Sequence, residues 1–337
     1  MRLYYAGKGK GGESLQLTTA PIPGPAKGEI LIQVKAAAFN FREVMIINKG
    51  TYSLPVKETF VPLADGVGEV VAVGEGVNTY KIKDRVAAVV FPEWRDGSFS
   101  IDFAAQLGGS LDGMLTEYKL LPEYAAVLIP DHLSWEEAAA FPCAGVTAWH
   151  ALTGGRPLLA GETVLTMGTG SVSLLALQFA KLFGANVIAT TSTLAKSNFL
   201  KTLGADEVIN YVDNPDWSVA VKALTGGHGA DHIIEVGGAG TITQSLKALH
   251  LNGAINLVGW LAAEKPLLDI NHFAATVGSM RRIAVGNRRH HQEMNRAVKA
   301  GKLKPVIDSV YPFDKARKAF DYFAAGKYLG KVVISMS

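Results

Sequence analysis

The protein has 337 residues, a length that suggests about two domains. Hydrophobic residues make up 48% and charged residues 19%, which is typical of globular proteins and argues against intrinsic disorder. The net charge of +3 indicates neither a nucleic-acid partner nor an anionic-membrane partner. The single cysteine, Cys143, excludes an intrachain disulfide and any zinc site built on two or four cysteines.

The sequence shows no targeting or membrane-spanning segment. The N-terminus lacks an apolar core of signal-peptide length, and no run reaches the roughly 18 uninterrupted apolar residues of a membrane span. The most apolar stretch, residues 164–180, is interrupted by several polar residues and glycines. A single cysteine also fits a reducing compartment. We therefore expect a soluble protein of the cytoplasm with no membrane partner.

The first part of the chain, up to about residue 125, consists of strand-like runs separated by Gly and Pro. The clearest runs cover residues 29–35, 68–74 and 84–90. Short strands at this spacing predict a barrel or a sandwich. The glycine-rich stretch 91–113 predicts a long loop, and long ordered loops are often functional.

From about residue 128 to 267, predicted strands alternate with predicted helices. The strands cover residues 163–167, 186–190, 207–209, 232–236 and 254–258, and the helices cover residues 171–183, 195–203, 216–224 and 241–249. This alternation predicts an α/β fold with a doubly wound parallel sheet. The tail is of mixed character, with strands at 281–285 and 331–335 and helices at 288–302 and 314–325.

A glycine motif joins the first strand of the alternating region to its first helix. Gly168-Thr169-Gly170-Ser171-Val172-Ser173 has the form G-x-G-x-x-S. Gly168 permits a tight turn, and Gly170 lets the backbone approach a pyrophosphate at the helix N-terminus. Ser173 is small enough for close packing of helix on strand. A tight turn without a ligand is the alternative, but the surrounding strand and helix favour a dinucleotide site.

The end of the next strand indicates which dinucleotide binds. An NAD site normally carries an acidic residue about 20 residues after the first glycine. The segment 188–193 carries no acidic residue there, and Lys196 follows within one helical turn. Hydroxyl groups and a cation suit a 2′-phosphate, which a carboxylate would repel. We therefore predict NADP, although Lys196 by itself fits a solvated surface lysine equally well.

Several motifs in order resemble one known family. They are Leu63–Gly74, Phe141–Leu152, Leu203–Tyr211, Glu235–Gly238 and Gly330–Val333. Together they resemble the medium-chain dehydrogenase/reductase superfamily over nearly the whole chain. The resemblance implies a GroES-like β-barrel domain from residues 1–127 and 268–337, with a Rossmann NADP-binding domain, residues 128–267, inserted between them. It also implies an active site in the cleft and a homodimer or homotetramer joined through the Rossmann domains.

The sequence departs from the zinc-dependent members of that superfamily. A cysteine ligand is expected near Asn40, where none is present, and the expected histidine position is Ala64. Only Cys143 remains, with Asp65 as a doubtful helper, whereas a catalytic zinc needs about three protein ligands. The lobe that would hold a structural zinc falls in residues 91–113, which contain no cysteine. We expect no metal. Without a metal, we interpret Cys143 as a small buried residue near the nicotinamide in preference to a reactive thiol.

The zinc-independent branch that this sequence resembles is the NADPH:quinone oxidoreductase group. By that resemblance, Asn40 lies near the nicotinamide and Tyr52 belongs to a Gly-x-Tyr segment at the substrate cleft. We predict that Asn40 and Tyr52 are catalytic or positioning residues. An equally good interpretation is that both have a structural role, in cleft packing and loop hydrogen bonds. Trp260 would line the substrate pocket with Tyr52, or pack as an ordinary aromatic. The cofactor-binding residues would be Asn40, Cys143, Thr147, Gly168, Thr169, Gly170, Ser171, Val172, Thr191, Ser192, Lys196, Tyr211, Val236, Gly237, Gly238, Val258, Gly259, Val285, Gly286 and Lys331.

These residues support three hypotheses for function. The first is a zinc-independent reductase that transfers hydride from NADPH to a small-molecule acceptor, either a quinone or an α,β-unsaturated carbonyl. The second is an NADP-dependent alcohol dehydrogenase or aldehyde reductase. The third is a nucleotide-binding protein with a structural or sensing role and little turnover. Without a metal to polarise an alcohol oxygen, the first is favoured.

Overall fold

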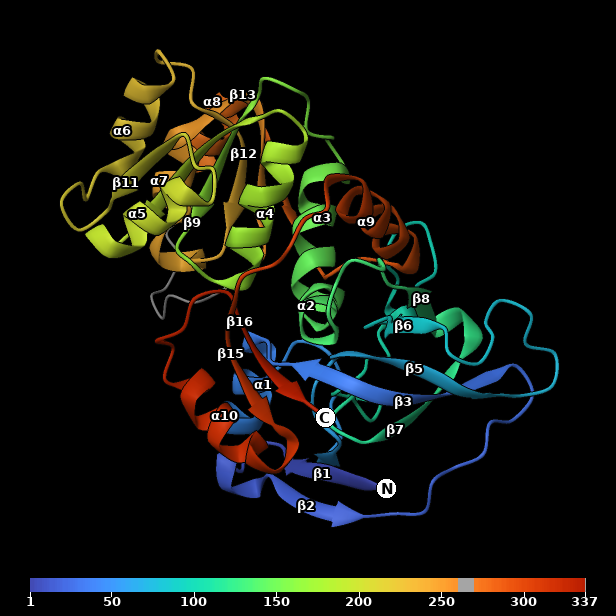
Figure 1. The fold of residues 1–337 in the computed structure, drawn as a ribbon. Coiled ribbons are helices and arrows are strands. Elements are labelled where there is room, and N and C mark those ends of the chain that lie inside the picture. Colours follow the sequence, from blue (N-terminus) through green and yellow to red (C-terminus); the bar gives the residue numbers. More distant parts are fainter. Residues whose placement is uncertain (260–269, 337) are drawn as a thin grey trace. The chain divides into compact units, whose positions relative to one another are not determined.

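The computed structural model describes residues 1–259 and 270–336, which form two compact units (Figure 1). Unit 1 contains Met1–Val146 and Gly286–Ser337, and unit 2 contains Thr147–Val285. Both boundaries come later in the chain than the expected 127/128 and 267/268. Helix α2 (Trp135–Ala139) packs on strands of unit 1, and strand β14 (Ser279–Arg282) completes the sheet of unit 2.

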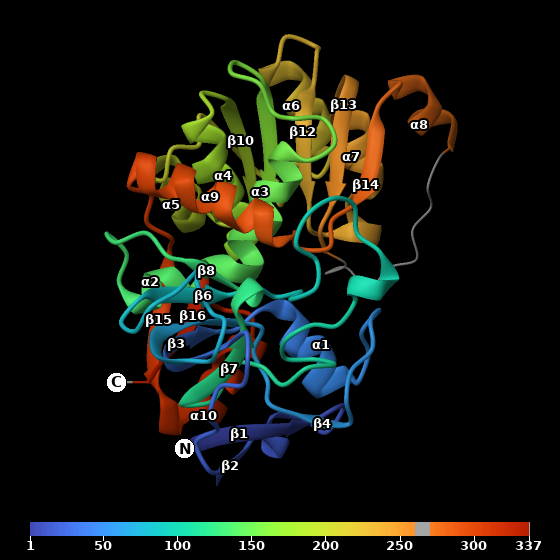
Figure 2. The same ribbon diagram turned by 90° about the vertical axis from the view of Figure 1, so that its right-hand side faces the viewer.

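Unit 2 is built on a six-stranded parallel sheet, as the alternating pattern predicts (Figure 2). Its strands lie in the order β11-β10-β9-β12-β13-β14, and every neighbouring pair is parallel. This is the 3-2-1-4-5-6 order of dinucleotide-binding domains, and the order reverses between β9 and β12. The strands are β9 (Thr163–Met167), β10 (Asn186–Thr191), β11 (Glu207–Asn210), β12 (Ala230–Glu235), β13 (Leu249–Leu257) and β14.

Helices connect these parallel strands by crossovers. Right-handed crossovers place α4 and α5 on one face of the sheet, and α6, α7 and α8 on the other. The bounds are α4 (Ser171–Leu182), α5 (Leu194–Thr202), α6 (Trp217–Leu224), α7 (Ile242–Ala248) and α8 (Ile270–Thr276), with α3 (Val146–Thr153) preceding the first strand. Leu165, Ile233 and Ile255, from three adjacent strands, are fully buried in this core. The buried centre of the sheet explains why its strands are short apolar runs.

Unit 1 consists of largely antiparallel sheets with few helices, and its one parallel pair among the described strands is β15–β16. A mixed sheet runs in the order β15-β16-β3-β5-β6-β8, with β7 also paired to β3, and a smaller sheet runs β2-β1-β4. The tail supplies β15 and β16, and β16 pairs with β3, so the two ends of the chain share one sheet. The strands are β1 (Arg2–Gly7), β2 (Gln16–Thr19), β3 (Glu29–Ala38), β4 (Thr59–Phe60), β5 (Asp65–Val73), β6 (Arg85–Ala88), β7 (Tyr118–Pro122), β8 (Ala126–Leu128), β15 (Ile307–Pro312) and β16 (Lys331–Ser335).

The helices of unit 1 include one that the strand-like pattern did not predict. Helix α1 (Phe41–Lys49) begins directly after β3, and Gly50 ends it in a left-handed conformation with φ of 64°. Helices α9 (Arg288–Gly301) and α10 (Ala316–Ala324) lie close to the expected ranges. Among residues 1–259 and 270–336, no helix has the length and apolar character needed to cross a membrane.

Aromatic packing orders part of the long loop 91–113. The rings of Phe91 and Trp94 each pack edge-on against Phe99, with centroids 5.5 and 5.0 Å away. The Trp94 indole N–H donates to the carbonyl of Gly97, and Asn287 of the tail donates to the same carbonyl. This cluster occupies the segment that would form the structural-zinc lobe in zinc-dependent relatives. It stabilises the segment by apolar burial and hydrogen bonds.

A buried histidine lies in the centre of the unit 2 sheet. His232 on β12 is fully buried, and its Nε2 lies 2.7 Å from a guanidinium nitrogen of Arg156. Arg156 also pairs with Glu162 at the start of β9. Burial, reinforced by the Arg156 cation, lowers the pKa of His232 to about 4. The ring is therefore neutral in the folded protein at neutral pH.

We predict that this histidine weakens the fold in mild acid. Between about pH 6.5 and 4 the unfolded chain protonates His232 while the folded chain does not, so stability is lost as pH falls. The slope is about 1.4 kcal/mol per pH unit for this group. His232→Gln keeps an acceptor for Arg156 but does not titrate, so its melting temperature should fall less than that of the wild type between pH 7.5 and 5. The exposed His228→Gln serves as control, and an equal fall in all three proteins would contradict the prediction.

Candidate functional site

The glycine motif forms an open turn between β9 and α4. Gly168 has φ of 71°, which favours glycine, and a Cβ atom built on Gly168 or Gly170 would meet no described heavy atom within 4 Å. Gly170 is the N-cap of α4, and no side chain caps its first turn. The first N–H groups of the helix therefore face this open space, where an anion would satisfy them. The hydroxyl of Ser173 donates to the carbonyl of Met167 at 2.6 Å, which closes the helix onto its strand.

The predicted 2′-phosphate residues gather at the ends of β10 and β11. Thr191 ends β10, and its carbonyl accepts the backbone N–H of Tyr211 at 2.9 Å. The Thr191 hydroxyl is buried and has no hydrogen-bond partner among the described residues. Ser192 and Lys196 follow at the start of α5, both half-buried. A buried hydroxyl without a partner indicates a missing polar neighbour, which a ribose or phosphate oxygen would supply.

A buried carboxylate shapes the next turn, after β12. Glu235 accepts from the backbone N–H groups of Gly237 and Gly238 at 2.8 and 2.9 Å, and from the hydroxyls of Thr241 and Ser245. Gly259 lies close beside this turn, because a Cβ on it would come within 2.5 Å of the Val236 carbonyl oxygen. The structure thus brings the predicted residues 236–238 and 258–259 together. Like the glycine motif, they lie at the carboxyl ends of the strands, where dinucleotides bind in this fold.

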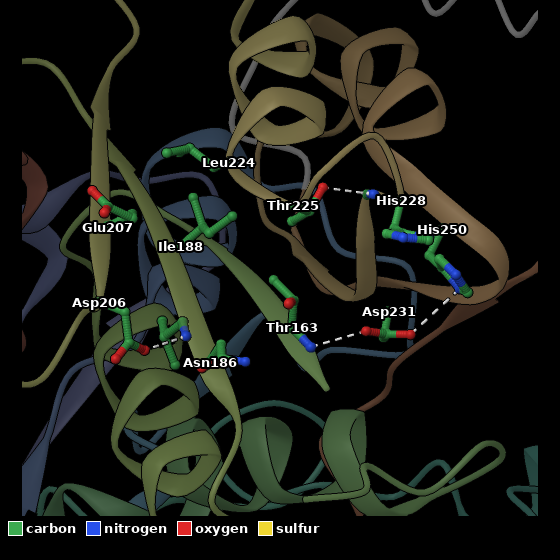
Figure 3. Close-up of a pocket in the computed structure, with 12 residues that line it drawn as sticks. Thr163, Asn186, Ile188, Asp206, Glu207, Leu224, Thr225, His228, Asp231 and His250 are labelled. Atoms are coloured by element: carbon green, nitrogen blue, oxygen red, sulfur yellow. Dashed lines mark hydrogen bonds and ion pairs between the residues drawn. The ribbon is translucent and has the colours of Figure 1, made fainter. Parts of the chain in front are cut away.

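The pocket shown in Figure 3 lies at the opposite, amino ends of the same strands. Thr163, Asn186 and Glu207 begin three of these strands, and they line a cavity of about 500 Å³ with His228 and His250. Two of its acidic side chains already bind protein groups, since Asp231 accepts from the Thr163 N–H and Asp206 from the Val187 N–H. This pocket is therefore not the predicted cofactor site.

In unit 1, Asn40 lies in a buried ionic cluster with Asp65 and Lys331. The Lys331 ammonium nitrogen is 2.6 Å from Asp65 Oδ2, 2.7 Å from Asn40 Oδ1 and 2.9 Å from the Phe39 carbonyl oxygen. The Asn40 amide nitrogen donates to Asp65 Oδ2 at 3.0 Å. Lys331 and Asp65 are both completely buried. The three protons of the ammonium group match these three acceptors, so Lys331, predicted as a cofactor ligand, has its donors engaged inside unit 1.

Cys143 reaches the same carboxylate through its backbone. Residues Phe141–Gly145 form a π-helical turn, and the Cys143 N–H donates to Asp65 Oδ1 at 2.7 Å instead of to a helical carbonyl. Such turns are frequent at functional sites. Burial, together with the nearby Asp65 carboxylate, raises the pKa of the Cys143 thiol to about 12. The side chain is therefore a neutral thiol at physiological pH, as expected for a small buried residue.

Tyr52 connects to this cluster through Arg42. The Arg42 guanidinium carbon lies 5.1 Å from the centre of the half-buried Tyr52 ring. Arg42 is buried and donates to Gln106 Oε1 at 2.8 Å and to the Leu107 carbonyl at 2.7 Å. Its neighbour Glu43 accepts the backbone N–H of Asn40 at 2.7 Å. The first turn of helix α1 thus places Arg42 and Glu43 between the ionic cluster, which contains Asn40, and the loop that carries Tyr52.

Of the other predicted site residues, the structure describes Thr147, Val285 and Gly286. Thr147 is buried on α3, and Val285 has φ of 50°, with its carbonyl 2.9 Å from His150 Nδ1. Gly286 begins the second segment of unit 1. Trp260 lies outside the described residues.

The motifs did not predict that Asp65, Arg42 and Glu43 lie in one cluster, or that Lys331 pairs with Asp65. A signal was present in the sequence. Asp65 and Lys331 are buried charged residues at the start of two mostly apolar strands, 65–73 and 331–335. Charged residues in buried strands are rare unless they are paired. The pairing itself links positions 266 residues apart, which no local pattern reveals.

Comparison with known proteins agrees with this architecture. Residues 26–131 match the model for the alcohol dehydrogenase GroES-like domain, and residues 171–300 match the model for zinc-binding dehydrogenases. A zinc-type alcohol dehydrogenase-like protein of Schizosaccharomyces pombe is 39% identical over 92% of this chain and 91% of its own length. The chain belongs to the medium-chain dehydrogenase/reductase family. It is therefore an oxidoreductase of the family, with a GroES-like domain and a Rossmann-type sheet.

Other members carry different names. A chloroplast envelope quinone oxidoreductase homologue of Arabidopsis thaliana is 30% identical over 98% of this chain and 97% of its own. The solved structure of an NAD-dependent alcohol dehydrogenase covers 100% of both chains at 34% identity and a TM-score of 0.90. A mycobacterial protein solved in complex with NADPH covers 99% of this chain and 100% of its own, at 26% identity and a TM-score of 0.81. The family thus includes quinone and alcohol enzymes and both nicotinamide cofactors.

The donor set of this chain does not fit the zinc that the family model implies. At the three ligand segments stand Asn40, whose amide is already engaged, Ala64, which has no donor, and Cys143, which offers a single thiol. Zinc binds thiolate, imidazole or carboxylate, and about three such protein ligands are needed. Among the described residues, no three His, Cys, Asp or Glu side chains are arranged to hold a metal ion.

We predict that Gly170→Ala weakens dinucleotide binding and largely spares the fold. Gly170 has φ of −73°, which alanine adopts, and its Cβ would enter open space. The change should cost at most about 1 kcal/mol of unfolding free energy, because alanine is a poorer N-cap than glycine. If a pyrophosphate passes over this backbone, the dissociation constant should rise at least about tenfold. Gly24→Ala, at another open and exposed glycine, is the control, and unchanged binding in Gly170→Ala would contradict the assignment.

Proposed function

We propose that this protein is a zinc-independent, NADPH-dependent reductase of quinones or α,β-unsaturated carbonyl compounds. The observation that carries the proposal is the donor set at the three ligand segments, which offers an engaged amide, a methyl group and only one thiol. Such a set leaves an alcohol oxygen without a strong Lewis acid. An acceptor that is already electron-poor needs less help to take a hydride.

The preference for NADPH is supported by the end of β10. Thr191, Ser192 and Lys196 stand where an NAD enzyme would carry a carboxylate, and Tyr211 joins them through its backbone bond to Thr191. A lysine and hydroxyl groups recognise a 2′-phosphate, whereas an acidic residue would repel it. The solved relatives include an NAD-dependent enzyme and a protein in complex with NADPH, so they do not decide between the two cofactors. We therefore base our choice of NADPH on the residues at the end of β10.

The roles of the chain's own residues follow from their chemistry. A nicotinamide held at the predicted cofactor residues would supply a hydride to a carbon or oxygen of the acceptor. The electron pair of the acceptor's double bond then resides on oxygen, which takes a proton from a hydrogen-bond donor or from water. We assign the binding of this oxygen to Asn40 and Tyr52, whose amide and phenol groups are neutral donors. Arg42 beneath the Tyr52 ring favours negative charge developing near the phenol.

The cofactor assignment predicts a selective loss in Lys196→Ala. A charge-assisted hydrogen bond to a phosphate contributes about 1.5–3 kcal/mol, so the dissociation constant for NADPH should rise about tenfold or more. Binding of NADH should change little, because NADH lacks the 2′-phosphate. Lys201→Ala, on the same helix but in its last turn, is the matched control. Equal losses for NADPH and NADH in the Lys196 variant, measured by cofactor fluorescence, would remove Lys196 from the phosphate site.

The acceptor assignment predicts NADPH oxidation with a panel of quinones and enones in protein shown by metal analysis to contain no zinc. Asn40→Ala and Tyr52→Phe should each lower turnover, by roughly tenfold if each removes one hydrogen bond to the developing anion. Unchanged turnover in both variants would remove these residues from the reaction. Alcohol-dependent reduction of NADP by zinc-containing protein would favour the alcohol dehydrogenase hypothesis. Tight NADPH binding without turnover would favour a sensing role.

The expectation of a homodimer or homotetramer remains a prediction. Within the described part of unit 2, β11 and β14 are the edge strands of the parallel sheet. Unpaired edges of this kind are able to pair with another copy of a chain.

A further inference from the structure

The ionic cluster of unit 1 lies where three strands begin or end. Asp65 begins β5, and its backbone pairs with Ala38 at the end of β3. Lys331 begins β16, which pairs with the same end of β3 through Val333 and Ala38. Asn40 follows β3 directly and precedes α1. The register of three strands from distant parts of the chain therefore brings these side chains together.

The two charges hold the Asn40 amide in one orientation. Its oxygen accepts from Lys331, and its nitrogen donates to Asp65. A flipped amide would place its NH2 group against the ammonium and its oxygen against the carboxylate, which is repulsive at both ends. The backbone N–H of Asn40 is bound to Glu43, so the residue is held through side chain and main chain. One N–H of the side-chain amide is not used by these contacts.

Stability alone does not account for this pair. A buried ion pair costs desolvation, and apolar residues of similar volume often serve a fold equally well or better. Asp65 also does more than balance Lys331, because its second oxygen accepts the Cys143 N–H. The carboxylate thus connects the two segments that would supply cysteine ligands in zinc-dependent relatives. Here these segments are joined by hydrogen bonds of the protein's own groups.

We propose that Lys331 and Asp65 are positioning residues for the reaction, and that they hold the remaining N–H of Asn40 toward the reacting groups. This inference rests on the proposed function, in which Asn40 contacts the acceptor. In this proposal Lys331 affects the reaction by orienting the Asn40 amide, and it does not contact the cofactor.

The test separates positioning from stability with charge-neutral variants. Lys331→Met leaves the Asp65 carboxylate buried without its cation, so it should lower the melting temperature strongly. Asp65→Asn combined with Lys331→Met removes both charges and should regain most of that melting temperature. We expect the rate of hydride transfer in single turnovers of this double variant to stay at least tenfold below wild type. The dissociation constant for NADPH should remain within about twofold of wild type.

A matched control comes from unit 2. Lys181 pairs with Asp206 at 2.7 Å, and Asp206 also accepts a backbone N–H, from Val187. Lys181→Met with Asp206→Asn should leave the hydride-transfer rate at the wild-type value. If the Asp65–Lys331 double variant regains both its melting temperature and its rate, the pair is structural only and the proposal is overturned.

A second readout does not depend on the acceptor. In protein labelled with 15N-asparagine, the Asn40 side-chain amide is assigned by its absence in Asn40→Ala. Its protons should exchange slowly in the wild type and faster in the double variant. Unchanged exchange would overturn the positioning role even in an active enzyme. If the wild type reduces no quinone or enone, the proposed function fails. Faster exchange of the Asn40 amide protons in the double variant than in the wild type would still show that the Asp65–Lys331 pair orients Asn40.

Discussion

The constraint on which unit 1 depends is the burial of one carboxylate, Asp65. A buried carboxylate must be paired and hydrogen-bonded, and Asp65 meets this demand with Lys331, the Asn40 amide and the Cys143 N–H. Each partner comes from a different segment. Satisfying one charge therefore fixes the start of β16, the end of β3 and the π-helical turn relative to one another, and with them the neutral groups that we assign to the reaction.

We assign a different task to unit 2, the binding of an anionic dinucleotide by a largely apolar sheet. In this assignment the anion contacts mainly backbone groups, those of the open turn at Gly168 and Gly170 and of the N-terminus of α4, which no side chain caps. We assign selectivity between dinucleotides to the side chains of Thr191, Ser192 and Lys196. The turn after β12 is stabilised by Glu235, whose carboxylate oxygen accepts the backbone N–H groups of Gly237 and Gly238 within the turn itself. The groups that we assign to dinucleotide binding are thus different from Glu235, which stabilises a neighbouring turn.

The sequence predicted most of unit 2 because its elements are local. Strand β9 begins and ends at the predicted residues, and α4 and β10 differ from their predicted ranges by one residue at the C-terminal end. Unit 1 was predicted less well. Helix α1 was missed because it lies between strand-like runs. In unit 2, the predicted strand 281–285 is found at Ser279–Arg282. The two compact units divide later in the chain than the predicted domain boundaries, because α2 packs with unit 1 and β14 pairs within unit 2, which their sequences do not reveal.

The sequence alone determined the alternating strands and helices, the glycine turn, the absence of an acidic residue after β10 and the loss of zinc ligands at Asn40 and Ala64. These are properties of short segments, and short segments carry their own periodicity and chemistry. Only the tertiary structure decided which groups surround Asn40, how Cys143 is held and what Lys331 binds. Those outcomes depend on strand register that joins residues as distant as Phe39 and Lys331, which are 292 positions apart, and register is set by the folded sheet.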